Sequence, residues 1–325
     1  MRYRGTVTGV FSAVVLGAAL AACARTDAPP AGAGAARTAS LPEGAEAMSL
    51  LGQPLFPPLI PAEARERLEV NLSAAQAAFE RTPEDADSII WLGRRLAYLG
   101  RYREAIEAFT RGIQLHPDDA RLYRHRGHRY ITVRRFDEAI RDLERAAALA
   151  RGRPDEVEED GAPNRFGIPT STLQSNIWYH LALARYLKGD FEGALPAWLE
   201  GMKVADNDDM LVATADWLYM TYRRLGREAD AERVLEPIHA GMKILENDAY
   251  HRRLLMYKGE IPADSLIAMD TEDPVQIATY GYGVGNWHFY NGDTARAREI
   301  FQRIRRASNW AAFGYIAAEA DLSRD

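Results

Sequence analysis

A pattern of small and large residues that returns after 34 positions constrains this 325-residue chain more than any other feature. A complete copy has a small residue in one apolar stretch, a glycine at a turn, and an alanine four residues before a large apolar residue, and two of the copies lack one of the first two markers. These markers are, copy by copy, Gly93, Gly100, Ala105 and Phe109; Gly127, Ala139 and Leu143; Ala182, Gly189, Ala194 and Trp198; Gly226, Ala231 and Leu235; Gly285, Gly292, Ala297 and Phe301. Such a period predicts stacked helical units, each burying its apolar face against its neighbours.

The residue types at the marker positions have steric reasons. A small residue lets two helices of one unit approach closely, and a turn glycine supplies the positive φ that ends the first helix. A proline such as Pro117 ends the second helix because it cannot continue one. Over about residues 86–310 this pattern resembles the tetratricopeptide repeat (TPR) family. The resemblance implies an all-α fold, a TPR-type helix-pair solenoid wound as a right-handed superhelix, with capping helices at its N- and C-terminal ends.

Departures from the period set the expected segments. The marker alanines Ala139 and Ala194 are 55 positions apart, which is one repeat plus an insertion, while Ala231 and Ala297 leave room for a degenerate pair between them. The expected segments are a lipoprotein signal peptide (1–22), a lipidated flexible tether (23–48), an N-terminal extension and capping helix (49–85), repeats 1 and 2 (86–153), an acidic insertion loop (154–174), TPR-like repeats 3–6 (175–308) and a C-terminal capping helix (309–325).

The N-terminus predicts where the protein resides. Two arginines precede an uncharged, mostly apolar stretch that is too short for a comfortable membrane span but suits a signal peptide. The stretch ends in Leu20-Ala21-Ala22-Cys23, which resembles a bacterial lipobox. That resemblance implies acyl chains on Cys23, palmitate among them, and Ala24 after it favours the outer membrane, facing the periplasm. An ordinary cleaved signal peptide is the alternative. The Ala-, Gly- and Pro-rich residues that follow predict a flexible tether.

Composition excludes several classes of protein. A single cysteine excludes a disulfide framework and any zinc site built from cysteines. The formal net charge of −6 argues against general nucleic-acid binding, so nucleic acid is an unlikely partner. We expect no cofactor and no catalytic site, because no phosphate-binding loop, nucleophile elbow or zinc-protease motif is present.

Two motifs have alternative interpretations. Gly281-x-Gly283-x-Gly285 superficially resembles a dinucleotide-binding loop, but no strand precedes it, so we interpret it as a closely packed helix face. His125 and His128 lie three residues apart and could share a helix face as metal ligands do. They leave open a second hypothesis, a metal-dependent or other enzyme.

The concave face of the solenoid is the expected binding surface. In the TPR family the first helix of each pair lines this face through positions 2, 5, 9 and 12. Carried over, these positions are Asp87, Ile90, Arg94 and Ala97; Arg121, Arg124, His128 and Ile131; Asn176, Tyr179, Leu183 and Tyr186. From these we select as the partner-binding groove Arg94, Arg121, Arg124, His128, Tyr179 and Tyr186.

Charge suggests the chemistry of the partner. Residues 94–153 contain 15 arginines against 8 acids, whereas the insertion 154–174 contains five acids and one arginine. Because arginine binds carboxylates in a bidentate fork, Arg94, Arg121 and Arg124 could grip an acidic peptide. A solvated basic face is the plainer interpretation, and a weaker one is binding of an anionic polymer. The acidic insertion could also fold over the basic repeats and compete with a ligand.

These observations favour a membrane-anchored envelope scaffold or adaptor that binds a protein or peptide partner in its concave groove. Cys23 would provide the lipid anchor. The identity of the partner, the process that it serves and the oligomeric state do not follow from the sequence.

Overall fold

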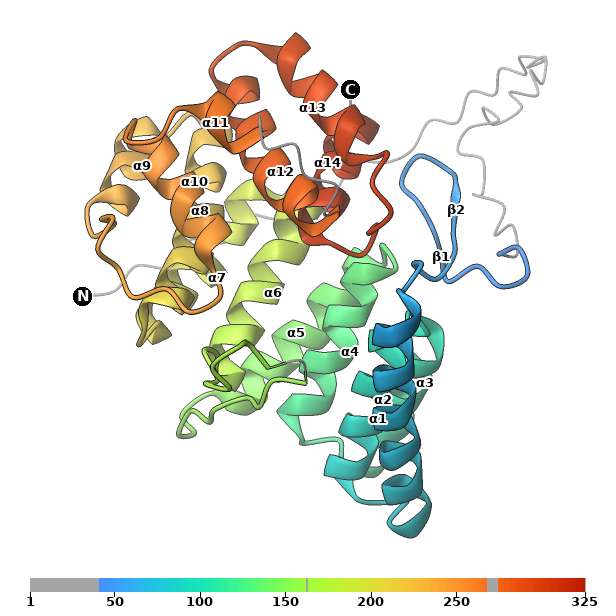
Figure 1. Ribbon diagram of the computed structural model, residues 1–325. Helices are drawn as coiled ribbons and strands as arrows, with labels where there is room; N and C mark the ends of the chain where they lie inside the picture. The colour runs from blue at the N-terminus through green and yellow to red at the C-terminus, as the bar shows by residue number, and fades with distance from the viewer. Residues whose placement is uncertain (1–40, 162, 268–273, 325) are drawn as a thin grey trace, which may run out of the picture. The chain divides into compact units, whose positions relative to one another are not determined.

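The computed structural model describes residues 41–161, 163–267 and 274–324 (Figure 1). Within these ranges the chain is almost entirely helical, with one small two-stranded sheet. The elements are β1 (Ala47–Met48), β2 (Pro54–Leu55), α1 (Ala62–Arg81), α2 (Ala86–Tyr98), α3 (Tyr102–Leu115), α4 (Ala120–Thr132), α5 (Phe136–Ala150), α6 (Leu173–Lys188), α7 (Phe191–Val204), α8 (Asp208–Arg224), α9 (Glu228–Leu235), α10 (Asp248–Tyr257), α11 (Ala263–Ile267), α12 (Pro274–Tyr290), α13 (Thr294–Ile304) and α14 (Phe313–Arg324).

Successive helices pack in pairs, and each pair packs against the next. The main pairs are α2–α3, α4–α5, α6–α7, α8–α9 and α12–α13. Their close approach depends on the marker glycines: a Cβ on Gly93 would lie 2.5 Å from ring atoms of Phe109, and one on Gly127 would lie 2.7 Å from Leu143. Gly285 faces Phe301 in the same way, which supports a packed helix face for the glycines of α12. The predicted all-α fold of helix pairs is confirmed.

The turns between paired helices also follow the expected chemistry. Gly100, Gly189, Gly226 and Gly292 all have positive φ, between 68° and 92°. The turn of the second pair differs, because Arg134 stands 34 residues after Gly100 and has a φ of 63°. This is the one non-glycine residue with positive φ in the described part of the chain, and most L residues avoid that region. Its side chain explains the exception, because it forms a buried ion pair with α14.

Part of the predicted tether is wrong. Signal peptide, Cys23 and tether up to residue 40 lie outside the described residues, but residues 41–48 are folded. Ala45 and Ala47 are buried, and β1 pairs with β2 in an antiparallel register that sets Ala47 opposite Leu55. A segment rich in small residues can be a flexible spacer, but its alanines can also be buried in a core. Composition alone therefore does not distinguish a tether from a folded segment.

The C-terminal helix does more than cap the last pair. α14 packs against α12 and α13, as a cap would, and also against α6 of the third pair. At its start, the Phe313 ring lies 5.4 Å from the ring of His128 on α4 and 5.6 Å from that of His180 on α6. The C-terminal segment therefore lies on the side formed by first helices, where the sequence predicted an open groove.

A buried ionic contact holds α14 in this position. Glu319 on α14 is fully buried and accepts hydrogen bonds from Arg134 Nε at 3.1 Å and Nη2 at 3.0 Å. It also accepts from the backbone N–H of Leu50 at 2.7 Å and from Arg305 Nη1 at 3.2 Å. Arg134 Nη2 further donates to the carbonyl of Trp310 at 2.9 Å. The unusual backbone of Arg134 thus places its guanidinium where the two ends of residues 41–324 meet.

Among the described residues, none of the helices combines the length and the apolar character needed to cross a bilayer.

Candidate functional site

A cavity of about 330 Å³ lies on the side formed by the first helices of the pairs. Its walls come from α2, α3, α4, α6 and α8, from the segment between α5 and α6, from α10 and the segment leading into it, and from Phe313 at the start of α14. Elements far apart in the sequence therefore enclose one space. The returning C-terminus and the insertion convert what the sequence predicted as an open groove into a bounded cavity.

Four of the six predicted groove residues line this cavity: Arg94, Arg124, His128 and Tyr179. Arg124 is buried, and its Nε atom has no hydrogen-bond partner in the described part of the chain. The Tyr179 hydroxyl lies 3.1 Å from that of Tyr250, and burial raises the pKa of Tyr179 well above its usual value. The four positions chosen from the TPR resemblance therefore lie on one side of the helix pairs, around the same cavity.

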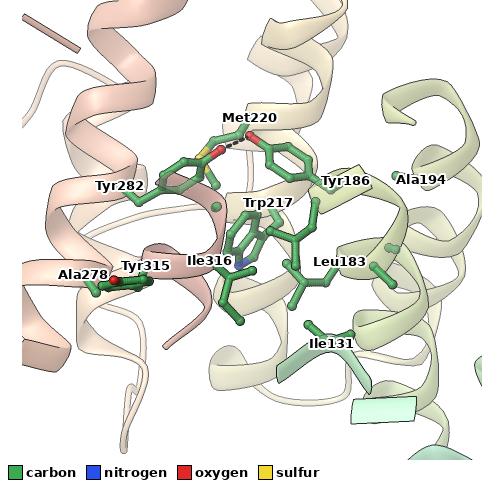
Figure 2. Packing of buried hydrophobic residues seen from close by; sticks show 14 of the residues in the cluster. Ile131, Leu183, Tyr186, Ala194, Trp217, Met220, Ala278, Tyr282, Tyr315 and Ile316 are labelled. Atoms are coloured by element: carbon green, nitrogen blue, oxygen red, sulfur yellow. Dashed lines mark hydrogen bonds between the residues drawn. The ribbon is translucent and has the colours of Figure 1, made fainter. Parts of the chain in front are cut away.

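Arg121 and Tyr186 do not line the cavity. The guanidinium of Arg121 is held by Asp119, with Nη2 to Oδ2 at 2.6 Å, and by Asp87, with Nη1 to Oδ1 at 2.6 Å. Tyr186 is fully buried, and its hydroxyl lies 2.8 Å from that of Tyr282 on α12. Figure 2 shows this hydrogen bond near Trp217 of α8. The prediction that Tyr186 faces a groove is wrong, because α12 covers this end of α6.

The acidic insertion lies against an arginine wall, which is formed by Arg94 and Arg124 at the cavity and by Arg95 beside it. Arg124 Nη2 pairs with Glu158 Oε1 at 2.9 Å, and both side chains are mostly buried. Arg94 Nη2 donates to the carbonyl of Glu159 at 2.6 Å, and Arg95 Nη1 donates to that of Gly161 at 2.7 Å. The insertion thus folds over the basic repeats, and the part of the surface that we expected to grip a carboxylate already holds one from the same chain.

Three histidines line the cavity, and all three are neutral near pH 7. Burial, reinforced by arginines nearby, holds the pKa of His125, His128 and His180 well below its usual value. His180 Nδ1 lies 2.6 Å from the carbonyl of Asn176, so it must donate its proton there, which leaves Nε2 as an acceptor. The rings of His128 and His180 are 4.3 Å apart. Neutral imidazoles can donate or accept hydrogen bonds to a bound molecule without adding charge.

The described residues provide no set of metal ligands for the hypothesis of a metal-dependent enzyme. Within the residues that the structure describes, no three or more His, Cys, Asp and Glu side chains gather in an arrangement able to hold a metal ion. His125 Nδ1 accepts a hydrogen bond from Arg124 Nη1 at 3.0 Å, so this nitrogen is already engaged by a cation. The histidine pair therefore belongs to a polar cavity wall.

Ion pairs account for much of the basic excess in residues 94–153. Besides Arg121 and Arg124, Arg126 forms two hydrogen bonds to Asp142, at 2.7 and 2.8 Å. Arg145 pairs with Asp118 at 2.9 Å, and Arg134 is buried against Glu319. A polyanion would have to compete with these carboxylates, so the structure offers little support for the anionic-polymer hypothesis.

Sequence reasoning missed several cavity residues. Arg129 is on α4, one position beyond His128, while Asp160, Glu246 and Phe313 come from the insertion, from the segment before α10 and from α14. The repeat template names positions on first helices only, so it carries no information about segments that return from elsewhere. Only the acidic composition of the insertion was a signal for Asp160.

Among the comparisons with known proteins, a family model agrees with the helix pair at the start of the repeats. The model of the tetratricopeptide repeat family matches residues 86–119, the first pair. No curated protein matches. Among solved structures, a tetratricopeptide repeat protein from Parabacteroides merdae has a TM-score of 0.45 at 15% identity, over 80% of this chain and 94% of that one. YrrB, described as a TPR protein with an unusual peptide-binding site, has a TM-score of 0.42 at 16% identity, over 77% and 99%. MamA has a TM-score of 0.41 at 15% identity, over 62% and 97%.

The chain is thus an all-α protein built of helix pairs, the first of which matches the tetratricopeptide repeat model, with a cavity lined by its first helices, its insertion and its C-terminal segment.

Proposed function

We propose that this protein is a non-enzymatic scaffold of the bacterial cell envelope, anchored through lipid on Cys23, that binds a protein or peptide partner through its concave side. The observation that supports it most is the convergence of Arg94, Arg124, His128 and Tyr179 on one cavity. The resemblance to the TPR family implies that these four positions face a partner, and their side chains line one cavity.

The chemistry of the arginine wall favours an acidic partner segment. Its present occupant is the Glu158–Gly161 stretch of the insertion, which contributes one side-chain carboxylate to Arg124 and backbone carbonyls to Arg94 and Arg95. An acidic segment of a partner could make the same contacts once the insertion moves aside. The insertion would then compete with the partner for the arginine wall.

Site-specific crosslinking in cells tests the binding surface. We would place a photoreactive amino acid at Arg94 or Asn176, both at the cavity and neither fully buried. We expect one discrete adduct that disappears when Arg124→Glu is added. The matched control is the same probe at Arg145, on the second helix of its pair. Equal labelling from both faces would contradict the proposal.

A second experiment tests the anchor alone. Cells grown with labelled palmitate should incorporate label into the wild-type protein and none into Cys23→Ser. A mature protein without lipid would remove the membrane part of the proposal and leave the binding part standing.

A further inference from the structure

One cation at the cavity lacks an acceptor of its own. The guanidinium of Arg129 forms no hydrogen bond and no ion pair with any of the residues described; it faces the ring of Tyr102, whose centroid lies 5.7 Å from Cζ. Every other cavity arginine is held: Arg94 by a carbonyl and Arg124 by Glu158. A partly buried charge without a counterion costs free energy, which a bound anion would offset.

The electrostatic surroundings of Arg129 support the same conclusion. Burial lowers its pKa to about 10, and the groups that act on it next are the phenols Tyr102 and Tyr98 and the cations Arg124 and Arg94. No carboxylate is among them. The acids of the cavity, such as Glu158 and Asp160, act on Arg124 and on each other instead. Among the residues that the structure describes, none therefore provides an anion for Arg129.

Arg129 also borders a second cavity, of about 500 Å³. Ala97, Tyr98, Arg129, Tyr250 and Phe313 line both spaces, so the two cavities meet along this wall. The second cavity is bounded beyond that wall by the proline-rich segment 58–61, by Trp217 on α8 and by the segment 308–314 that leads into α14.

The second cavity is lined by apolar and aromatic side chains, such as those of Trp217 and Phe313, together with polar groups that include Thr279 and Asn309. Leu59 is 90% exposed, which is unusual for a leucine, and it stands at the rim together with Ile60 and Val275. Small-molecule sites typically combine such walls with a few polar groups that fix orientation, in cavities of roughly 300–1,000 Å³. Arg129 lines both cavities, and the second one places apolar side chains on the far side of this cation.

We propose that the two adjoining cavities bind a small amphipathic anion, with its acidic head group on Arg129 and its apolar tail along the apolar side chains of the second cavity. The head group is a carboxylate or a phosphate monoester, since the guanidinium fork binds both. His128, at the polar side, provides a neutral hydrogen-bonding group beside the head group. The site shares His128 with the proposed partner-binding side, but binding of a small anion needs no protein partner, so the proposal goes beyond the proposed function and is tested separately from it.

Calorimetric titration of the purified full-length protein tests the ligand class. The probes are octanoate and octyl phosphate, below the concentrations at which they form micelles. The controls are acetate and inorganic phosphate, which lack the tail, and octanol and octylammonium, which lack the negative charge. We expect each anionic amphiphile to bind at least roughly tenfold more tightly than any control, the equivalent of about one good interaction. The tighter of the two head groups then distinguishes a carboxylate from a phosphate ligand.

Variants at the cation test the assigned residue. Arg129→Gln should weaken binding of the anionic amphiphile by at least roughly tenfold, because a charge-assisted hydrogen bond is lost. Its melting temperature without ligand should not fall, since an uncompensated charge is removed. Arg129→Lys keeps the charge and should retain part of the affinity, and Arg145→Gln on α5 is the matched control.

Several results would overturn this proposal. They are no binding of either amphiphile, equal binding of octylammonium, binding of acetate or phosphate as tight as that of the long-chain anions, or unchanged affinity in Arg129→Gln. If Arg129→Gln did not fold, unchanged affinity in Arg129→Lys together with tight octanol binding would have the same consequence.

Discussion

Two regions of this protein are held together in different ways. In the helix pairs α2–α5 the packing is steric: Gly93 admits the ring of Phe109, and Gly127 admits Leu143. At the returning C-terminus the contacts are ionic and buried, with Glu319 bound by Arg134 and Arg305, and Asp321 bound by Arg224. The first kind of contact joins residues 16 positions apart, and the second joins residues up to 185 apart.

The difference shows what each kind of contact does well. Close packing of a small residue against a large one needs only the local period, and it repeats along the chain at little cost in chain entropy. A distant segment has no period to align it. A buried carboxylate with several donors is satisfied in one arrangement only, so it fixes where α14 sits. We expect substitutions in the two regions to reveal this contrast.

The largest effect is expected at Glu319. Glu319→Gln removes the charge that compensates two arginines, Arg134 and Arg305, in a buried setting. Breaking a buried ion pair at one partner typically costs about 3–5 kcal/mol, and urea unfolding measures that loss in the free energy of unfolding. The control is Glu138→Gln, whose partner Arg135 is half-exposed, where less than about 1 kcal/mol is expected. Equal losses of unfolding free energy in the two variants would show that the buried ion pair at the C-terminus contributes no more than an exposed one.

Arg134→Gly compares the preference of the turn for glycine with the contribution of the Arg134–Glu319 ion pair. By the repeat pattern alone this change should stabilise the turn, because glycine accepts a φ of 63° without strain. The structure predicts the opposite, a loss of about 2 kcal/mol, because strain relief of about 1 kcal/mol is outweighed by the lost ion pair with Glu319. Denaturant unfolding decides the sign, and a gain in stability would show that the buried pair adds little.

Gly93→Ala tests steric packing in the first pair. The new Cβ would lie 2.5 Å from ring atoms of Phe109, so we expect a loss of about 1–3 kcal/mol despite the better helix propensity of alanine. The double variant Gly93→Ala/Phe109→Leu should lose clearly less than the sum of the single changes, because leucine leaves room for the methyl group. Additive losses would mean that the two residues do not couple.

A pH effect is the smallest of these predictions. The folded state holds the pKa of His128 below its usual value, so below about pH 6.5 the unfolded chain takes up a proton that the folded chain does not. Stability contributed by this group is therefore lost as the pH falls. Between about pH 7.5 and about pH 5.5, wild type should lose about 1 kcal/mol more than His128→Gln. Parallel profiles for the two proteins would show that His128 titrates normally.

Much of the cavity could be predicted and part of it could not. The positions of Arg94, Arg124 and His128 follow from helical periodicity, because residues three, four or seven apart on one helix share a face. The burial of Tyr186 could not be predicted from the residues around it, because the residue that packs over it, Tyr282, is 96 positions away in the sequence. Arg129 was missed for a similar reason: its importance depends on what the rest of the chain fails to place beside it.

The sequence by itself determined the helix pairs, their order and their close packing, because a 34-residue period of small and large residues acts between neighbours along the chain. Only the tertiary structure decided that the C-terminal segment and the acidic insertion close the concave side into a cavity. That closure depends on single buried carboxylates meeting distant arginines, and one such pair leaves no periodic trace in a sequence.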